Sequence, residues 1–310
     1  MNKIVSVIIP AYNASKTIEQ TLVSVFEQTY EDIEIIVVND GSIDQTLEIL
    51  EKYTNKINMI STSNKGVSHA RNLGLLHAKG FYIQYLDSDD LLMPDKLSVQ
   101  VNALNTSNAD VAYGDWQKFI QNSTEIKLLE KIERQISGDI EIALFTDFWC
   151  PPAALLYTKK ITDQLSWNEN LPVIQDARYL LDSALAKGKF IYTPGIMARY
   201  RTAQEKSLSQ KSEAAFVRDC FENAKEVYQI WAATTKFDQA KKSAVIGVLR
   251  YCINRFSVFD HQLANKAIDL LLHIAPKYIP EQRSLLRSLS KIFGYRNAEK
   301  IAGLKRHLIK

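Results

Sequence analysis

The sequence has few cysteines and no long apolar segment. Cysteine occurs at three of 310 positions, Cys150, Cys220 and Cys252. Their odd number and the absence of CxxC spacing argue against a disulfide framework and a zinc site, so we expect small buried side chains. No apolar run approaches the ~18 residues of a membrane span, and Met1-Asn2-Lys3 leads into a strand pattern rather than a signal peptide. These absences predict a cytoplasmic protein.

The net charge of +3 hides an uneven distribution. Residues 1–200 carry 18 Lys and Arg against 25 Asp and Glu, a net −7, whereas residues 201–310 carry 20 against 10, a net +10. The two parts are therefore expected to meet different partners. The acidic part suits a metal ion, and the basic part suits an anionic surface such as lipid head groups or a lipid diphosphate.

Apolar runs alternate with helical patterns in the first part of the chain. Residues 4–9 and 33–38 read as strands that end in turn formers, and residues 17–27 and 45–53 read as amphipathic helices. This strand–helix–strand–helix order predicts a parallel sheet. Ligands of such sheets bind beyond the carboxyl ends of the strands, where Tyr12, Asn13 and Asp40 stand.

An acidic cluster follows a third apolar strand, residues 81–86. Asp87-Ser88-Asp89-Asp90 places two carboxylates, spaced by one residue, at the end of this strand. Two anions a few Å apart favour a bound cation, and a divalent ion with oxygen ligands is the natural occupant. Asp90 alone is expected to cap the next helix. Phosphatases of the haloacid dehalogenase type also place Asp-x-Asp after a strand, but usually after the first strand and with a following Thr.

Four motifs in this order resemble those of the family 2 inverting glycosyltransferases. They are VIIPAYN at 7–13, IVVNDGS at 36–42, NKGVSHARNLG at 64–74 and LDSDD at 86–90. The resemblance covers roughly the first 200 residues. It implies an α/β GT-A fold with a mostly parallel central sheet, a nucleotide-binding half at 1–110 and an acceptor half at 111–210, followed by a basic helical C-terminal region at 211–310.

The resemblance also implies a donor site for a nucleotide diphosphate sugar, with uridine as the expected nucleoside. The residues expected to contact the donor are Pro10, Ala11, Tyr12, Asn13, Glu19, Asp40, Arg71, Asp87, Ser88, Arg199 and Arg201. Tyr12 would lie against the base, Asp40 would accept the imide N–H of uracil, and Arg71, Arg199 or Arg201 would contact the diphosphate. For three of these residues a local structural role is the alternative to donor contact. Asp40 would shape a turn, and Glu19 and Arg71 would be charged helix residues that face solvent.

The metal ligands and the base are expected from the same resemblance. Asp89 would be the main ligand of Mn²⁺ or Mg²⁺, with Asp87 as its helper. Asp176, pointing outward near a helix start, would be the catalytic base. The Glu that usually precedes this base is Gln175 here, and a role in complementing the helix dipole is the alternative for Asp176.

One tryptophan and two histidines are the remaining side chains of interest. Trp149 would either form a wall of the acceptor site, where a sugar could stack on its ring, or pack against the protein without touching a ligand. His69 and His77 have no acidic or His partner at ligand spacing, and both are expected to face solvent.

The last hundred residues read as helices with a basic amphipathic character. Arg283, Arg287 and Lys291 recur at intervals of four beside apolar positions, a pattern typical of contact with a membrane surface or of packing on the catalytic domain. Peripheral contact with the inner face of the cell membrane is the prediction. Nucleic acid is not an expected partner, because no nucleic-acid motif accompanies these charges.

The sequence thus predicts an inverting sugar transfer to a saccharide or lipid-linked saccharide acceptor in surface polysaccharide biosynthesis. A non-catalytic sugar-nucleotide binding protein is the alternative, because of Gln175 and because Thr202-Ala203-Gln204 stand where the family usually has a His. A nucleotidyltransferase would open with a basic, Gly-rich phosphate loop, which Pro10-Ala11-Tyr12-Asn13 is not.

Overall fold

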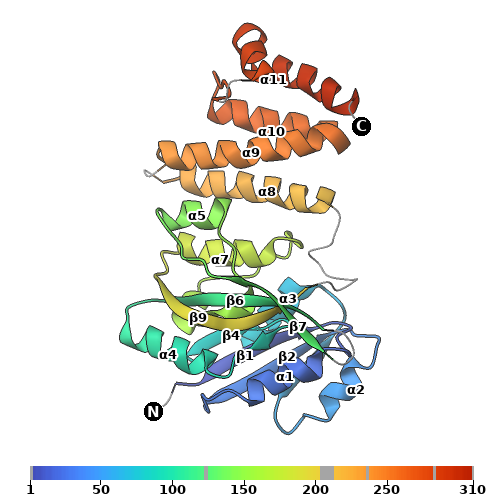
Figure 1. Cartoon of the computed structure of the whole chain (residues 1–310), viewed down its shortest axis with the longest axis vertical. Helices are drawn as coiled ribbons and strands as arrows, with labels where there is room; N and C mark the ends of the chain where they lie inside the picture. Colours follow the sequence, from blue (N-terminus) through green and yellow to red (C-terminus); the bar gives the residue numbers. More distant parts are fainter. Residues whose placement is uncertain (1–2, 122–124, 203–212, 235–236, 282–283, 309–310) are drawn as a thin grey trace. The chain divides into compact units, whose positions relative to one another are not determined.

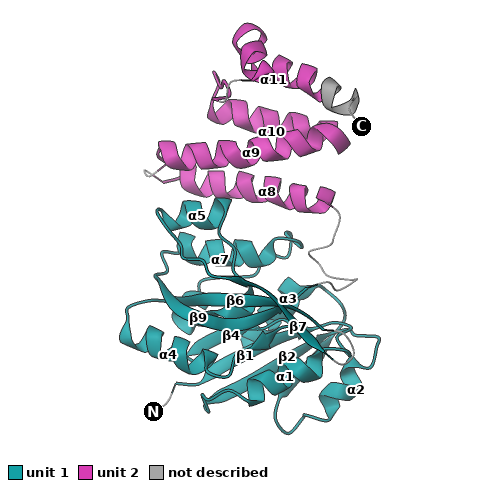
Figure 2. Ribbon diagram, viewed as in Figure 1, with its two compact units in different colours: residues 1–207 teal, residues 208–310 magenta. Residues whose placement is uncertain are grey.

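The computed structural model describes residues 3–121, 125–202, 213–234, 237–281 and 284–308, with side chains described up to residue 303. The chain divides into two compact units, unit 1 (Met1–Ser207) and unit 2 (Leu208–Lys310), shown in two colours in Figure 2. Unit 1 is a mixed α/β domain, and unit 2 is helical (Figure 1).

Unit 1 is built on one sheet, with strand order β3-β2-β1-β4-β8-β6-β9-β5 and β7 paired to β6. Strands β1 to β4 pair in parallel with one another, whereas β8 is antiparallel to both β4 and β6, and β9 is parallel to β6. The strands are β1 (Val5–Ala11), β2 (Ile33–Asp40), β3 (Asn58–Thr62), β4 (Tyr82–Tyr85), β5 (Leu91–Leu92), β6 (Val111–Gln121), β7 (Ile126–Ile132), β8 (Leu155–Thr158) and β9 (Phe190–Arg201).

The central strands explain why polar residues meet at one edge of this sheet. Every residue of β1 is buried, as expected for a central strand of a parallel sheet covered on both faces. In the register, Ile8 lies opposite Ile36 of β2 and Tyr85 of β4, and Ala11 lies opposite Asn39. The carboxyl ends of β1, β2 and β4 therefore fall at one edge, which is where the predicted site residues begin.

Helices alternate with the strands along unit 1. They are α1 (Ile18–Phe26), α2 (Thr46–Glu51), α3 (Val67–His77), α4 (Lys96–Thr106), α5 (Ile140–Thr146), α6 (Lys159–Thr162) and α7 (Gln175–Leu185), with a short 3₁₀ turn, η1 (Pro152–Ala154). Ile18, Leu22 and Val25 are buried on one face of α1, as its periodicity predicts. Helix α3 contacts β1 and β2, and it approaches so closely that a Cβ on Gly74 would lie 2.4 Å from Ile8 Cγ2.

The described part of unit 2 contains α8 (Glu213–Ala232), α9 (Gln239–Phe259), α10 (His261–Ile274) and α11 (Leu285–Leu308). Helix α9 contacts α8, α10 and α11. A break at Gly294, where φ is 77°, separates two helical parts of α11. Within the described ranges, no helix is both long and apolar enough to span a bilayer.

The three cysteines are free; Cys150 and Cys252 are buried and Cys220 is partly buried. The expectation of small buried side chains is thus confirmed for Cys150 and Cys252.

Candidate active site

The loops after β1 and β2 are tied together by hydrogen bonds. The Asn13 backbone N–H donates to Ser42 Oγ at 3.0 Å, and the Ile43 N–H donates to Asn13 Oδ1 at 2.9 Å. Asn13 adopts a left-handed backbone conformation, with φ of 50°, that asparagine tolerates well. Pro10 and Ala11 are buried in β1, whereas Tyr12 is 47% exposed. The loop therefore presents the Tyr12 ring to solvent, as a surface on which a base can stack.

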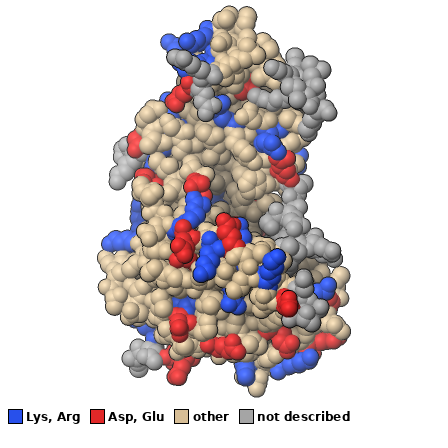
Figure 3. Space-filling view, viewed as in Figure 1, with Lys and Arg blue, Asp and Glu red and all other residues tan. Residues whose placement is uncertain are grey.

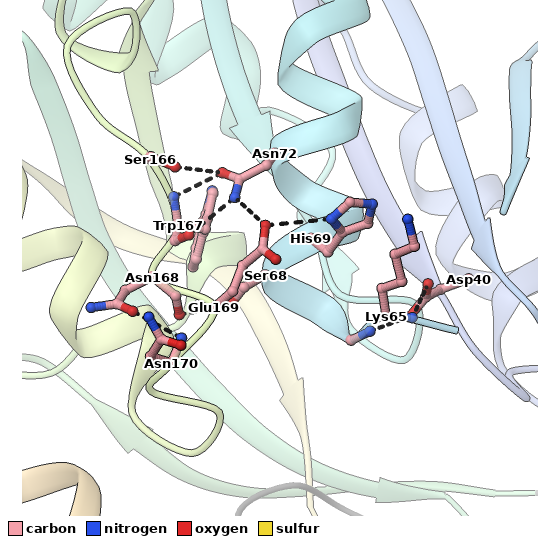
Figure 4. Close-up of polar contacts among 11 residues, drawn as sticks. Asp40, Lys65, Ser68, His69, Asn72, Ser166, Trp167, Asn168, Glu169 and Asn170 are labelled. Carbon is pink, nitrogen blue, oxygen red and sulfur yellow. Dashed lines mark hydrogen bonds and ion pairs between the residues drawn. The ribbon is translucent and has the colours of Figure 1, made fainter. Parts of the chain in front are cut away.

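Asp40, at the end of β2, is buried and fixes the start of α3. Its carboxylate oxygens accept the backbone N–H groups of Lys65 at 2.9 Å and Gly66 at 2.8 Å (Figure 4). The following residue, Gly41, has φ of 72°, and a Cβ there would lie 2.6 Å from the Asn64 nitrogen, so only glycine fits. Asp40 thus has a turn-forming role, and each oxygen keeps a lone pair for a further donor. Its contact with uracil stays a prediction.

Arg71 is not a solvated helix residue, and this correction changes its role. Its side chain is 1% exposed, forms an ion pair with Asp87 through Nη2, and stacks on Trp167 with the guanidinium carbon 4.1 Å from the ring centroid. Helix α3 lies against the sheet, so its Arg71 face is covered. Nε and Nη1 have no hydrogen-bond partner among the described residues. Arg71 therefore holds Asp87 in place, and its contact with a diphosphate stays a prediction.

The acidic loop after β4 concentrates negative charge. Asp87, Ser88 and Asp89 are partly buried and Asp90 is fully buried. Burial, and next the charge of Asp87, raise the pKa of Asp89 to about 6. Burial also raises the pKa of Asp90 well above its usual range, with Asp89 and Asp87 adding to the effect. Adjacent carboxylates that resist ionising together are the electrostatic signature of a place where a cation would be stabilised.

A divalent ion fits this donor set. Carboxylate oxygens of Asp87 and Asp89 are hard ligands suited to Mn²⁺ or Mg²⁺, which complete their shell with phosphate and water oxygens. Within the described ranges, no three His, Cys, Asp or Glu side chains gather as a ready-made metal cage. Two protein ligands therefore define the candidate site, and metal binding stays a prediction.

Asp90 does not cap a helix, contrary to expectation. Strand β5 follows it, and α4 begins only at Lys96. The Asp90 side chain instead accepts the backbone N–H of Arg201 at 2.8 Å. This bond ties the acidic loop to the end of β9, which lies far away in sequence.

Arg201 anchors the acidic loop. Its Nε donates to the Asp89 carbonyl oxygen at 2.7 Å, and Nη1 and Nη2 donate to Gln121 and Gln20, both at 2.8 Å. The guanidinium also lies over the Phe119 ring, 4.5 Å from its centroid. Since each of its nitrogens is engaged, Arg201 reads as a structural clamp rather than a free diphosphate ligand. Arg199 is partly buried, with no partner for Nε among the described residues.

Asp176 is partly buried and bonded to Trp149 instead of pointing outward, which corrects the expectation for α7. Its Oδ2 accepts the Trp149 indole N–H at 2.7 Å, and Oδ1 accepts the Ala177 backbone N–H at 2.8 Å. Burial raises the pKa of Asp176 above its ordinary value. A carboxylate with a raised pKa is a better proton acceptor near neutral pH, which suits a general base.

Gln175 is buried beside this base and has a structural role. With the amide oriented by its hydrogen-bond partners, the side-chain nitrogen donates to the carbonyl oxygens of Pro172 and Val173 at 3.0 and 3.2 Å. A glutamate could donate there only when protonated. The exchange of Glu for Gln at this position therefore suits the local backbone.

Tyr200 was missed by the sequence analysis as a site residue. Burial, and next the charges of Asp90, Asp87, Asp176 and Asp89, raise the pKa of its hydroxyl. The Tyr200 ring meets Trp149 edge to face, with centroids 5.5 Å apart. The only sequence signal was strand alternation, which directs Tyr200 to the opposite face from Arg199 and Arg201.

Two other predicted positions have partners from distant segments. Glu19 is exposed on α1, and its carboxylate accepts the Tyr53 hydroxyl at 2.7 Å. His69 was expected to face solvent, with no acidic partner at ligand spacing, but it is only partly exposed and its Nδ1 lies 3.4 Å from Glu169 Oε1 (Figure 4). The partner is a hundred residues away in sequence, which is why spacing did not reveal it.

Helix α3 holds the segment before α7 through side-chain hydrogen bonds. Asn72 Oδ1 accepts the Trp167 backbone N–H at 2.8 Å, and Asn72 Nδ2 donates to the Trp167 carbonyl at 3.0 Å (Figure 4). Ser68 Oγ donates to the Asn168 carbonyl at 3.2 Å. These bonds connect the helix that carries Arg71 to the segment that leads into Asp176.

Comparison with known proteins supports one family. An uncharacterized glycosyltransferase of Rickettsia typhi is 38% identical over 144 residues, 46% of this chain and 45% of the relative. The Escherichia coli UDP-Glc:alpha-D-GlcNAc-diphosphoundecaprenol beta-1,3-glucosyltransferase WfgD is 37% identical over 122 residues, 39% of this chain and 48% of the relative. The chain spans about half the length of these curated relatives.

The fold also matches solved structures. The Staphylococcus aureus protein TarS, residues 1–349 in complex with UDP-GlcNAc, aligns with a TM-score of 0.69 at 20% identity, covering 97% of this chain and 91% of that one. The mixed α/β unit with its mostly parallel sheet is thus the expected GT-A fold. The model of glycosyl transferase family 2 matches residues 6–174, more than half of the chain. The chain therefore belongs to glycosyl transferase family 2.

Proposed function

We propose that this protein transfers one sugar, with inversion, from a uridine diphosphate sugar to a saccharide or lipid-linked saccharide acceptor in surface polysaccharide biosynthesis. One observation carries the proposal. Trp149 donates to Asp176 and its ring meets Tyr200, while Arg201, the next residue of β9, is bonded to Asp89 and Asp90, so one network of contacts joins the predicted base to the acidic loop. An inverting displacement needs this combination, with charge neutralisation at the leaving group and a base for the acceptor.

Each residue has a distinct task in this proposal. Asp176 takes the proton of the acceptor hydroxyl while that oxygen bonds to the sugar carbon and the bond from this carbon to the diphosphate breaks, its electron pair leaving with the diphosphate. Asp87 and Asp89 would hold Mn²⁺ or Mg²⁺, which supplies Lewis-acid neutralisation of the departing diphosphate. Tyr12 and Asp40 would receive the uracil base.

The choice of donor and acceptor rests on the relatives. The name of WfgD states a UDP-glucose donor and an acceptor linked to diphosphoundecaprenol. TarS was crystallised with UDP-GlcNAc. A related donor and a lipid-linked acceptor are therefore proposed here.

Unit 2 is proposed to contact the inner face of the cell membrane, which would bring a lipid-linked acceptor to the cytoplasmic enzyme. Leu285, Ile292 and Phe293 of α11 are 62%, 71% and 53% exposed. Lys291 directly precedes Ile292 in the sequence, and Lys and Arg side chains are visible at the α11 end of the face in Figure 3. Apolar and cationic side chains together favour an anionic lipid surface. Arg283, part of the expected basic pattern, lies outside the described residues.

The experiment that tests this function uses the full chain and a panel of UDP-sugars, with UDP release as the measurement. Asp176→Asn should lower turnover by at least about 100-fold, as expected for loss of a general base. UDP binding should survive. Asp163→Asn, at an exposed position paired with Lys159, is the matched control and should turn over like the wild type. Unchanged turnover in Asp176→Asn would refute the base assignment, and no turnover by the wild type would favour the non-catalytic binding protein.

The metal assignment has its own readout. Thermal stabilisation by a UDP-sugar should be larger with Mn²⁺ than in EDTA, because a ligand that binds the folded state raises its stability by mass action. Asp89→Asn should remove the difference. Equal stabilisation with and without metal would contradict the assignment of Asp87 and Asp89.

A further inference from the structure

Trp149 is bonded to the residue proposed as the base. It lies between α5 and η1, and its indole N–H donates to Asp176 Oδ2 at 2.7 Å. The other carboxylate oxygen, Oδ1, accepts the Ala177 backbone N–H at 2.8 Å. With one donor on each oxygen, the carboxylate cannot rotate without breaking a hydrogen bond to a charged group.

The Trp149 ring is itself held by two aromatic neighbours. Trp116 meets it edge to face, with centroids 5.8 Å apart and planes at 89°, and Tyr200 meets it with centroids 5.5 Å apart and planes at 77°. Such contacts restrict the ring to one orientation. The indole N–H is therefore a preorganised donor, and it is not free to bind a sugar hydroxyl.

The surroundings of Asp176 contain few groups that stabilise its charge. Arg71 from α3 favours the anion, whereas Asp87 after β4 disfavours it. The Tyr157 hydroxyl from β8, the Tyr200 hydroxyl from β9 and the Cys150 thiol share this environment and are neutral. The Trp149 N–H is thus a principal neutral donor to the carboxylate.

We propose that Trp149 is a positioning residue, whose indole N–H holds the Asp176 carboxylate in the orientation needed to take the proton of the acceptor. This proposal rests on the proposed function, because it assumes that Asp176 is the base. It replaces the expectation that Trp149 serves as a stacking wall for a sugar.

The experiment compares Trp149→Phe with Trp116→Phe in the full chain. Both changes remove an indole N–H from the same aromatic cluster, but the Trp116 N–H has no hydrogen-bond partner among the described residues. Initial rates of UDP release are measured with UDP-glucose or UDP-GlcNAc, whichever the wild type uses faster, across a range of pH. Circular dichroism and UDP affinity confirm that each variant is folded.

Trp149→Phe should lower kcat about tenfold or more while KM for the sugar nucleotide changes less than about threefold, because the lost N–H is bonded to Asp176. The acid limb of the pH profile should move up by about one unit, since a donor to the ionised carboxylate is lost. Trp116→Phe should change neither. If Trp149→Phe fails to fold, 3-benzothienylalanine at position 149 keeps the ring size without the N–H.

Two results would overturn the inference. One is an unchanged kcat and acid limb in Trp149→Phe, and the other is an equal loss in Trp116→Phe, which would assign the effect to ring packing. A separate result would contradict the proposed function, namely an Asp176→Asn variant that turns over as fast as the wild type. An inactive Asp176→Asn beside a fully active Trp149→Phe would reject the role of Trp149 alone.

Discussion

Replacing Arg201 with lysine tests whether this arginine is the clamp of the acidic loop. Lysine keeps the positive charge but has a single nitrogen, so it can replace only one of the hydrogen bonds to the Asp89 carbonyl, Gln121 and Gln20. It also lacks the planar group that lies over Phe119. The change therefore removes directional contacts while nearly preserving the electrostatics.

The expected loss of stability follows from the bonds that lysine cannot make. Hydrogen bonds from charged groups are worth about 1.5–3 kcal/mol each, but Gln20 and Gln121 are partly exposed and can exchange the lost donor for water. We therefore expect Arg201→Lys to lower the free energy of unfolding by about 2–3 kcal/mol. For a unit of this size, ~2–4 °C per kcal/mol predicts a fall in Tm of roughly 5–10 °C.

Calorimetry and urea unfolding followed by circular dichroism measure this loss. Arg199→Lys is the matched control on the same strand, because its Nε has no partner among the described residues, and it should change stability by less than about 0.5 kcal/mol. Equal Tm values for Arg201→Lys and Arg199→Lys would refute the assignment of Arg201 as a clamp. Turnover should fall with Arg201→Lys, since the loop that carries Asp87 and Asp89 loses its anchor.

Two further predictions concern the core. Lys96 is buried, and its Nζ donates to the Leu155 carbonyl at 2.8 Å. Burial lowers the pKa of Lys96 well below its usual value, so the unfolded chain binds more protons than the folded chain. The free energy of unfolding of the wild type should therefore rise with pH toward ~10.4. Lys96→Met should be more stable than the wild type by a margin that is larger at pH 7 than at pH 9.5, and a margin independent of pH in urea unfolding would contradict this. Gly74→Ala should destabilise the fold by about 1–3 kcal/mol, because the added Cβ would collide with the buried Ile8. Gly247→Ala in α9, where nothing lies within 4 Å of the added Cβ, should stabilise it by about 0.5–1 kcal/mol. Similar changes of Tm in the two variants, measured by calorimetry, would show that the packing at Gly74 is loose.

Sequence patterns predicted the helices and strands of unit 1 well where apolar residues recur regularly on one face of the element. The helix expected at 17–27 is α1, Ile18–Phe26, and the strand expected at 81–86 is β4, Tyr82–Tyr85. The helix expected at 45–53 is the shorter α2, Thr46–Glu51. Buried positions repeat every 3.6 residues in a helix and every 2 in a strand, so neighbouring residues in the sequence are enough to reveal the element.

The order of strands and turn formers also placed Tyr12, Asn13, Asp40 and Asp87 at one edge of the sheet. Because β1 pairs in parallel with β2 and β4, these strands end at the same edge whatever their side chains contact. The fold, and the meeting of these predicted site residues at one edge of the sheet, therefore follow from the sequence pattern.

Only the tertiary structure decided what each charged or polar side chain of the site contacts. Asp87 meets Arg71, Asp89 is held by Arg201 through its carbonyl, and Asp176 meets Trp149. The physical reason is that a hydrogen bond or an ion pair depends on two groups approaching within about 3 Å, and segments far apart in the chain meet only when the sheet is assembled. Local periodicity shows which way a residue faces, whereas its partner is set by the packing of the whole unit.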